Sequence, residues 1–165
     1  MGKDTNIEKH GRGDRLLKEL EHDPYMARHK PAEPTACPKC KVVFSGGRWQ
    51  WTDTVHDGAN EELCPACRRI GDKVPAGYLT LGGDFFEAHR EEIMNLVRHK
   101  EESEKAAHPM KRLMDVEERE GGAVITFTDT HLPRGAGEAI QKAYEGKLEI
   151  NYTKESNIVR VTWER

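Results

Sequence analysis

Four cysteines in two pairs are the residues of this chain whose types and spacing most clearly predict chemistry. Cys37 and Cys40 lie in CPKC, Cys64 and Cys67 lie in CPAC, and these four are all the cysteines of the 165 residues. Thiolates at this spacing are typical ligands of Zn²⁺, and four of them complete its tetrahedral shell without leaving a position open for catalysis. The pattern therefore predicts one structural Zn²⁺ per chain, with a redox dithiol as the alternative.

Composition and charge limit the class of protein. Hydrophobic residues make up 36% of the chain and charged residues 33%, and no run approaches the roughly 20 apolar residues of a membrane span. The first residues, MGKDTNIEKHGRGD, lack the apolar segment of a signal peptide, so we expect a soluble cytoplasmic protein with no membrane partner. Thiols stay reduced in that compartment, which favours metal binding over disulfides. With a net charge of −3, nucleic-acid contact has to come from local basic patches.

Apolar residues, glycines and prolines divide the chain into three parts. Residues 1–36 predict a flexible tail with one short helix in RLLKELEHDPYM; the alternative is a segment that orders in a partner's groove. Residues 37–77 hold few large apolar side chains, so zinc binding has to supply the folding energy of a zinc-ribbon or treble-clef-like unit. Residues 78–165 predict an α+β domain.

Hydrophobic periodicity predicts the elements of this third part. A strand at residues 78–81 precedes a long helix that starts in DFFE and that Pro109 interrupts, and MKRLMDVEERE predicts a second helical segment. A strand in AVITFTDT, a helix from Pro133 to Tyr144 and a hairpin of KLEINYT with IVRVTWER follow. The order β-α-β-α-β-β predicts a two-layer domain with helices on one face of the sheet.

Basic and aromatic residues surround the cysteine pairs. Trp49 and Trp51 share one face if their segment is extended, and six cations lie nearby: Lys39, Lys41, Arg48, Arg68, Arg69 and Lys73. Aromatic rings stack on unpaired bases while cations meet phosphates, which favours RNA contact through these residues. The alternative is that the two tryptophans are structural, and we expect at least one of them to pack on the cysteine-containing unit itself.

No catalytic signature is present in the sequence, and every cysteine is used by the metal pattern, so we expect no enzyme. The nearest candidate is TDTHLPRG, where His131 and Arg134 sit at a strand-to-helix junction and a helix start can hold a phosphate. We include both residues among the expected RNA contacts. The alternative is a helix capped by Asp129 or Thr130, with His131 and Arg134 as surface residues; an enzymatic site is a third reading.

From Cys37 onward the chain resembles the large-ribosomal-subunit export adaptor family of archaea and eukaryotes. The resemblance lies in CPKCKVVFSGGRW, in CPACRR, and in the order of GYLTLGGDFFEAHREEI, VITFTDTHLPRGAGEAI and VRVTWER, in arrangement more than in identity. Small bacterial zinc-ribbon proteins without assigned function resemble it more closely. The chain has cysteines for one zinc site where the family has more, and it shows neither the family's further C-terminal domain nor its shuttling signals, so export is not implied.

The resemblance implies a ribosome-associated factor. Family members bind the intersubunit face of the large subunit over the tRNA sites. We therefore expect this chain to bind rRNA of the large subunit there and to block translation, as a dormancy (hibernation) or assembly factor with no small-molecule substrate. The residues carried over are the four cysteines and the basic and aromatic residues beside them. A zinc-stabilised protein-interaction adaptor that does not bind RNA is the alternative.

Overall fold

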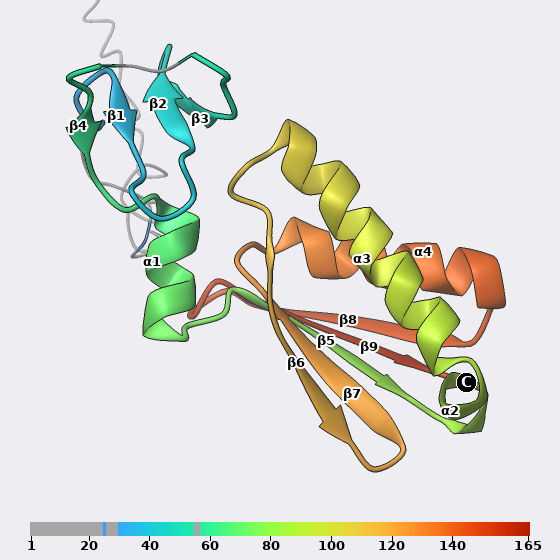
Figure 1. Cartoon of the computed structure of the whole chain (residues 1–165). Helices are drawn as coiled ribbons and strands as arrows, with labels where there is room; N and C mark the ends of the chain where they lie inside the picture. The colour runs from blue at the N-terminus through green and yellow to red at the C-terminus, as the bar shows by residue number, and fades with distance from the viewer. Residues whose placement is uncertain (1–24, 26–29, 55–56) are drawn as a thin grey trace, which may run out of the picture.

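The computed structural model describes Tyr25, residues 30–54 and residues 57–165. It has a small four-stranded sheet followed by one helix, and a larger five-stranded sheet with two long helices (Figure 1). The α+β class predicted from the sequence is thereby confirmed. The short helix predicted in RLLKELEHDPYM lies outside the described residues, apart from Tyr25.

The smaller part, which we call the cysteine unit, comprises β1 to β4 and α1. Its bounds are β1 Thr35–Ala36, β2 Val43–Ser45, β3 Arg48–Gln50, β4 Asn60–Glu61 and α1 Pro65–Asp72. The sheet order is β3-β2-β1-β4, with β1 and β4 parallel and the other pairs antiparallel. Gly46 and Gly47 form the two-residue turn of the β2–β3 hairpin, where positive φ angles of 62° and 79° favour glycine.

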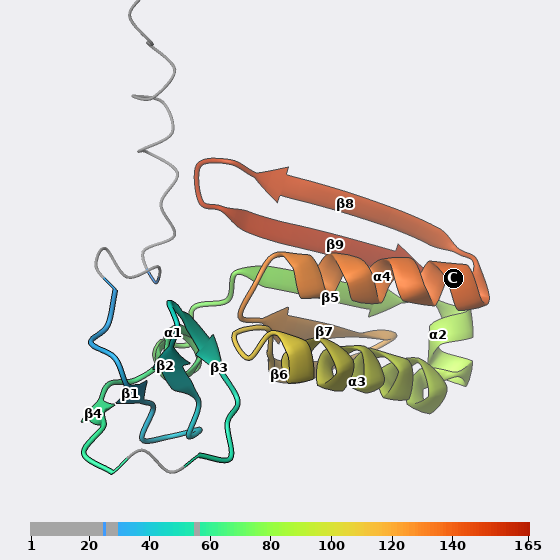
Figure 2. The ribbon, with the colours of Figure 1, turned by 90° about the horizontal axis from the view of Figure 1, so that it is seen from above.

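The larger part, the α+β domain, runs from β5 to β9. Its bounds are β5 Gly77–Gly82, α2 Asp84–Ala88, α3 Arg90–Ala107, β6 Leu113–Arg119, β7 Gly122–Phe127, α4 His131–Tyr144, β8 Lys147–Thr153 and β9 Ile158–Glu164. The sheet order is β6-β7-β5-β9-β8, and only the β5–β9 pair is parallel. Helices α3 and α4 lie side by side on one face of this sheet (Figure 2), as the two-layer prediction required.

The core of the α+β domain lies between this sheet face and the two helices. Alternate residues of the central strands point into it, so β5 and β9 each show buried and partly exposed positions in turn. Trp163 is fully buried, and its indole N–H donates to the carbonyl oxygen of Glu145 at 2.7 Å. This core contains none of the cysteines, so the domain has its own source of stability.

The segment MKRLMDVEERE is a strand at its centre, and the prediction of a helix there was wrong. Residues Leu113–Arg119 form β6, which pairs antiparallel with β7 across a tight turn at Gly121, where φ is +74°. Leu113 and Val116 pack against the core, while the charged residues of the strand are exposed. The Met, Leu, Glu and Arg content favours a helix locally, but pairing with β7 overrides that propensity. The observed order is therefore β-α-α-β-β-α-β-β.

A close backbone approach joins the start of β5 to the start of α4. At Gly77, an added Cβ would lie 2.5 Å from Cγ of Pro133 and 2.7 Å from the carbonyl oxygen of Asp129. Only glycine fits such an approach without displacing backbone. The loop that follows β7 is thus held against the chain that leaves the cysteine unit, and this brings the predicted site residues of the two parts near one another.

Candidate metal centre and adjoining groove

The four cysteine sulfurs converge on one point. Their Sγ atoms all lie within 4.8 Å of one another, and none of the four cysteines is in a disulfide. The Sγ atoms of Cys40 and Cys64 are 3.7 Å apart. Four sulfurs bound at about 2.3 Å around a tetrahedral ion would be spaced by about 3.8 Å. The donor set therefore fits a single tetrahedral metal ion, as the sequence predicted.

Different local structures position the two cysteine pairs. The first pair lies in the turn between β1 and β2, where the amide of Cys37 donates to Val42 at 2.8 Å and Lys41 takes a positive φ of 69°. The second pair opens helix α1, because Cys64 is its N-cap and Pro65 its first residue. The Cys64 sulfur accepts the amide N–H of Cys67 at 3.3 Å, as a capping side chain does.

A buried arginine of the α+β domain reaches into this cysteine cluster. The guanidinium of Arg112 donates to the sulfurs of Cys40 at 3.1 Å and Cys67 at 3.3 Å, and lies 3.8 Å from that of Cys64. Its Nε donates to the carbonyl oxygen of Pro109 at 2.8 Å, and only 8% of the residue is exposed. Sequence reasoning missed Arg112, because its position 45 residues after Cys67 carries no local signal of this contact.

The buried positive charge of Arg112 indicates that the cysteines fit a metal ion, because it needs negative charge nearby. A buried guanidinium is costly unless anions compensate it. Within the described residues, its side-chain hydrogen-bond partners are one carbonyl and the three sulfurs, and the ring of Trp51 lies 5.5 Å from its guanidinium carbon. Burial opposes the charged form, yet the hydrogen bond to Cys40 and the negative charge of its sulfur keep the pKa of Arg112 above its ordinary value. Four thiolates around a divalent ion carry a net charge of −2, which is the counter-charge that Arg112 requires.

In the protein without metal, the cysteine thiols do not ionise alike. Burial opposes ionisation of Cys37, but the surrounding amide donors, led by that of Cys64, outweigh it and lower its pKa to about 6. Burial raises the pKa of both Cys64 and Cys67 above the ordinary thiol value. Metal binding near neutral pH must therefore displace protons from the second pair.

We accordingly expect the apparent zinc affinity to fall as pH is lowered through the neutral range. Protons compete with the metal for Cys64 and Cys67, whose raised pKa values keep them protonated in the metal-free form. Competition with a chromophoric chelator across a pH series, corrected for the chelator's own protonation, measures this slope. An affinity that does not change with pH would contradict the assignment of these thiols as ligands.

A groove of about 710 Å³ lies between the cysteine unit and the α+β domain. It brings together four of the predicted RNA contacts, which come from two segments of the chain: Arg48, Trp49 and Trp51 from β3 and the residue after it, and His131 from the start of α4. The end of α3 and the following loop complete the wall with His108, Pro109, Met110 and Lys111. Sequence reasoning did not find His108 or Lys111, because only the tertiary fold places this loop opposite β3.

The two tryptophans of the groove differ in role. Trp49 is half-buried and packs edge-on against Phe44, with ring centres 5.4 Å apart, which confirms that one tryptophan packs on the cysteine unit. Trp51 is 40% exposed, and its indole N–H donates to the carbonyl oxygen of Lys105 in α3 at 2.9 Å. Trp51 is therefore the ring that can offer a face to a ligand while staying anchored.

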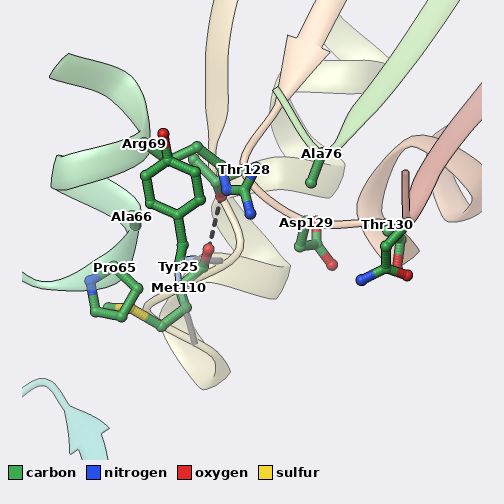
Figure 3. A pocket seen from close by; sticks show the side chains of 10 residues that line it. Tyr25, Pro65, Ala66, Arg69, Ala76, Met110, Thr128, Asp129 and Thr130 are labelled. Atoms are coloured by element: carbon green, nitrogen blue, oxygen red, sulfur yellow. Dashed lines mark hydrogen bonds between the residues drawn. The ribbon is translucent and has the colours of Figure 1, made fainter. Parts of the chain in front are cut away.

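Arg69 lies elsewhere, in a smaller pocket of about 300 Å³ between α1 and the loop that precedes α4 (Figure 3). It is buried, donates to the carbonyl oxygen of Val74 at 3.0 Å, and stacks on the ring of Tyr25 at 4.2 Å. The Tyr25 hydroxyl in turn donates to Asp72. The structure thus gives Arg69 a packing role and does not bring it to the groove.

The remaining predicted contacts are exposed but do not line the groove. Lys39 and Lys41 flank the first cysteine pair, while Arg68 and Lys73 belong to α1 or its end, with Arg68 ion-paired to Glu62 at 3.4 Å. Arg134 is exposed on α4 and ion-paired to Glu138 at 3.0 Å. The structure therefore places these five cations on the surface outside the groove.

Asp129 forms the cap at the start of α4. Its carboxylate accepts the amide N–H groups of His131 at 3.0 Å and Leu132 at 3.2 Å, which agrees with the capping alternative. Burial raises the pKa of Asp129, although these two amide donors favour its charged form. Because the carboxylate already fills this helix start, a phosphate at the groove would meet the side chain of His131 rather than the amides of the helix.

Comparison of the chain with protein-family models, with curated proteins and with solved structures gave no match. Among the described residues, no helix combines the length and the apolar character that crossing a membrane requires.

Proposed function

We propose that this protein is a zinc-stabilised RNA-binding factor, which associates with the large ribosomal subunit in the cytoplasm and blocks translation. The observation that carries the proposal is the groove in which Arg48 and Trp51, from β3 and the residue after it, meet His131 at the start of α4. Such a combination of an exposed ring with cations suits one unpaired base and its flanking phosphates. No catalytic step is part of the proposal.

Basic side chains outnumber the one carboxylate, that of Asp129, among the residues that line the groove, which supports a nucleic acid as its ligand. Arg48 is exposed and has no ion-pair partner among the described residues, so its guanidinium can meet a phosphate. Lys111 is half-buried, and its ammonium group is ion-paired to the carboxylate of Glu104 at 3.1 Å. The side chains of His108 and His131 line the groove from an exposed position, and both can donate to phosphate oxygens. Stacking on Trp51 would hold a base whatever its identity.

The metal serves structure in this proposal. Four sulfurs occupy every position of a tetrahedral ion, so no water or substrate binds it, and zinc is the ion that a tetrathiolate set most commonly holds. Bound zinc would supply the folding energy that the small cysteine unit lacks. The cysteines and Arg112 then hold β3 and Trp51 against the end of α3.

The ribosomal step of the proposal is supported by the resemblance to the large-subunit export adaptor family. The cysteine pairs and the sequence segments that follow them carry that resemblance, while β6 is a strand that the resemblance did not include. The groove would supply a surface for rRNA. A factor placed over the tRNA sites would block initiation and subunit joining. Storage of inactive ribosomes or late assembly of the large subunit are the two processes in which this block is useful.

Sucrose-gradient sedimentation of the tagged protein in cell lysate tests the proposal. We expect it to migrate with the large subunit at low salt and to leave it at moderate salt, because each phosphate contact releases counterions. Added protein should also inhibit translation in vitro. Migration only at the top of the gradient, together with full translation at excess protein, would contradict the proposal.

We expect Arg134→Ala to weaken ribosome binding modestly while leaving the thermal midpoint unchanged. Its ion pair with Glu138 is exposed, with 60% and 53% of the two side chains accessible, and such pairs contribute little to stability. Thermal unfolding and gradient binding measure the two effects. Glu138→Ala is the matched control, because it removes the same ion pair but keeps the cation. Binding by Arg134→Ala equal to that of the unsubstituted protein would restrict the RNA surface to the groove side.

A second candidate, a protein-interaction adaptor, is favoured by one observation. The edge strand β8 exposes Ile150 and Tyr152, which are 38% and 50% accessible, beyond the cover of α4. An edge strand with exposed apolar side chains can pair with a strand of another protein. If the gradient experiment shows no ribosome association, the double variant Ile150→Lys, Tyr152→Lys tests this candidate. A protein partner that the unsubstituted protein binds and the double variant does not would be assigned to β8.

A further inference from the structure

We propose that Arg112 couples the metal centre to the groove, so that metal binding by the cysteines sets the position of Trp51. Arg112 is a positioning residue in this proposal, because it touches neither the metal ion nor a ligand of the groove. This coupling is a property of the protein alone and does not depend on RNA binding by the groove.

The first part of the coupling is the contact with both cysteine pairs. One guanidinium nitrogen donates to Cys67 at 3.3 Å, and another donates to Cys40 at 3.1 Å while lying 3.8 Å from Cys64. Cys40 belongs to the turn after β1, whereas Cys64 and Cys67 belong to the start of α1. An ion bound by the four sulfurs would hold these acceptors from both pairs in one arrangement, and the planar fork of arginine matches it as a lysine cannot.

The second part is the anchoring of Arg112 in the α+β domain. Its amide N–H donates to Oγ1 of Thr128 at 2.8 Å, and its carbonyl oxygen accepts the amide N–H of Thr128 at 2.9 Å. The Thr128 hydroxyl also donates to the carbonyl oxygen of Met110 (Figure 3). Because Nε also donates to the carbonyl oxygen of Pro109, Arg112 is held through both its backbone and its side chain. Because Arg112 is fixed in the α+β domain, a change in the sulfur positions moves the cysteine unit relative to its guanidinium.

The third part leads from Arg112 to the groove. Its guanidinium carbon lies 5.5 Å from the ring centre of Trp51, within the range of a cation–π contact. Trp51 is also tied to the end of α3 through its bond to Lys105. The metal centre, Arg112, Trp51 and α3 thus form one continuous set of contacts. Removing the metal separates the two cysteine pairs, releases the guanidinium and leaves one wall of the groove without its support.

The test uses the full chain with zinc bound and compares Arg112→Met with Arg68→Met, which removes an exposed arginine of α1. Chelator competition gives the zinc affinity, and the indole N–H resonances in an NMR spectrum report on the tryptophans. Trp163 serves as an internal reference, because its indole is bound inside the α+β core. Trp51→Phe assigns the resonance of Trp51.

We expect Arg112→Met to lower zinc affinity about 10- to 100-fold, as loss of groups that orient metal ligands generally does. With zinc still bound, its Trp51 resonance should move toward the position seen in the chelated wild-type protein, while Trp163 and the Arg68→Met spectrum stay unchanged. Wild-type zinc affinity, or an unmoved Trp51 resonance, in Arg112→Met would overturn the proposal. If a displaced Trp163 resonance shows that Arg112→Met is misfolded, Arg112→Lys replaces it. Wild-type zinc affinity or an unmoved Trp51 resonance in Arg112→Lys would then overturn the proposal.

Discussion

Replacing Cys64 and Cys67 together by serine is expected to abolish zinc binding and to unfold the cysteine unit. The buried cluster of this unit is made of the cysteines themselves with little else, chiefly Val42 and Ala66. Structural zinc supplies roughly 10–16 kcal/mol in small modules of this kind, which is more than so small a core can replace. The α+β domain should stay folded, because its core excludes the cysteines.

Metal analysis of the purified double variant and the environment of Trp49 measure this effect. Trp49 packs on Phe44 inside the cysteine unit, whereas Trp163 reports on the other domain. Pro38→Ser is the matched control: it changes an exposed residue within the first cysteine pair and keeps all four sulfurs. One zinc per chain in the double variant, or a native Trp49 environment without zinc, would show that the four-cysteine site is not what folds the unit.

The second large effect is expected at Trp51. If this ring stacks on a base of rRNA, Trp51→Ala should cost about 1–3 kcal/mol of binding free energy, or about 5- to 150-fold in affinity. Trp51→Phe keeps a ring but loses the indole donor to Lys105, so its loss should be smaller. Both variants must retain zinc and the Trp163 signal for the comparison to count.

Binding of these variants to purified large subunits gives the affinity directly. Arg48→Ala should act differently from Trp51→Ala, because loss of a phosphate contact reduces the salt dependence of binding as well as its strength. Wild-type affinity in both Trp51→Ala and Arg48→Ala would show that the groove does not bind the large subunit, and a protein-binding surface such as β8 would then be the better candidate.

The metal site could be predicted from the sequence because its information is local. Two residues between the cysteines of each pair restrict how their sulfurs can point, and the hairpin of β8 and β9 likewise shows an alternation that fits only a strand. Pro133 in the first turn and Gly146 after the last turn marked α4 in the same way. Each of these features depends on a few neighbouring residues.

The features that sequence reasoning missed depend on long-range contacts. Strand β6 has the residues of a helix and becomes a strand only because β7 pairs with it. Arg112 lies at the start of the same segment, directly before β6, and nothing near it in the sequence indicates that its guanidinium reaches the sulfurs. The groove arises where β3 meets the end of α3, so His108 and Lys111 could not be associated with Trp51 before the fold was known.

Ultraviolet cross-linking of the zinc-loaded protein to ribosomes, followed by mapping of both the linked peptide and the linked RNA, tests directly whether the groove binds rRNA. We expect cross-links from the segment that holds Arg48 and Trp51 to rRNA of the large subunit near the tRNA sites, and their loss in Trp51→Ala. Cross-links that join this segment only to proteins, or RNA cross-links that Trp51→Ala leaves unchanged, would contradict it.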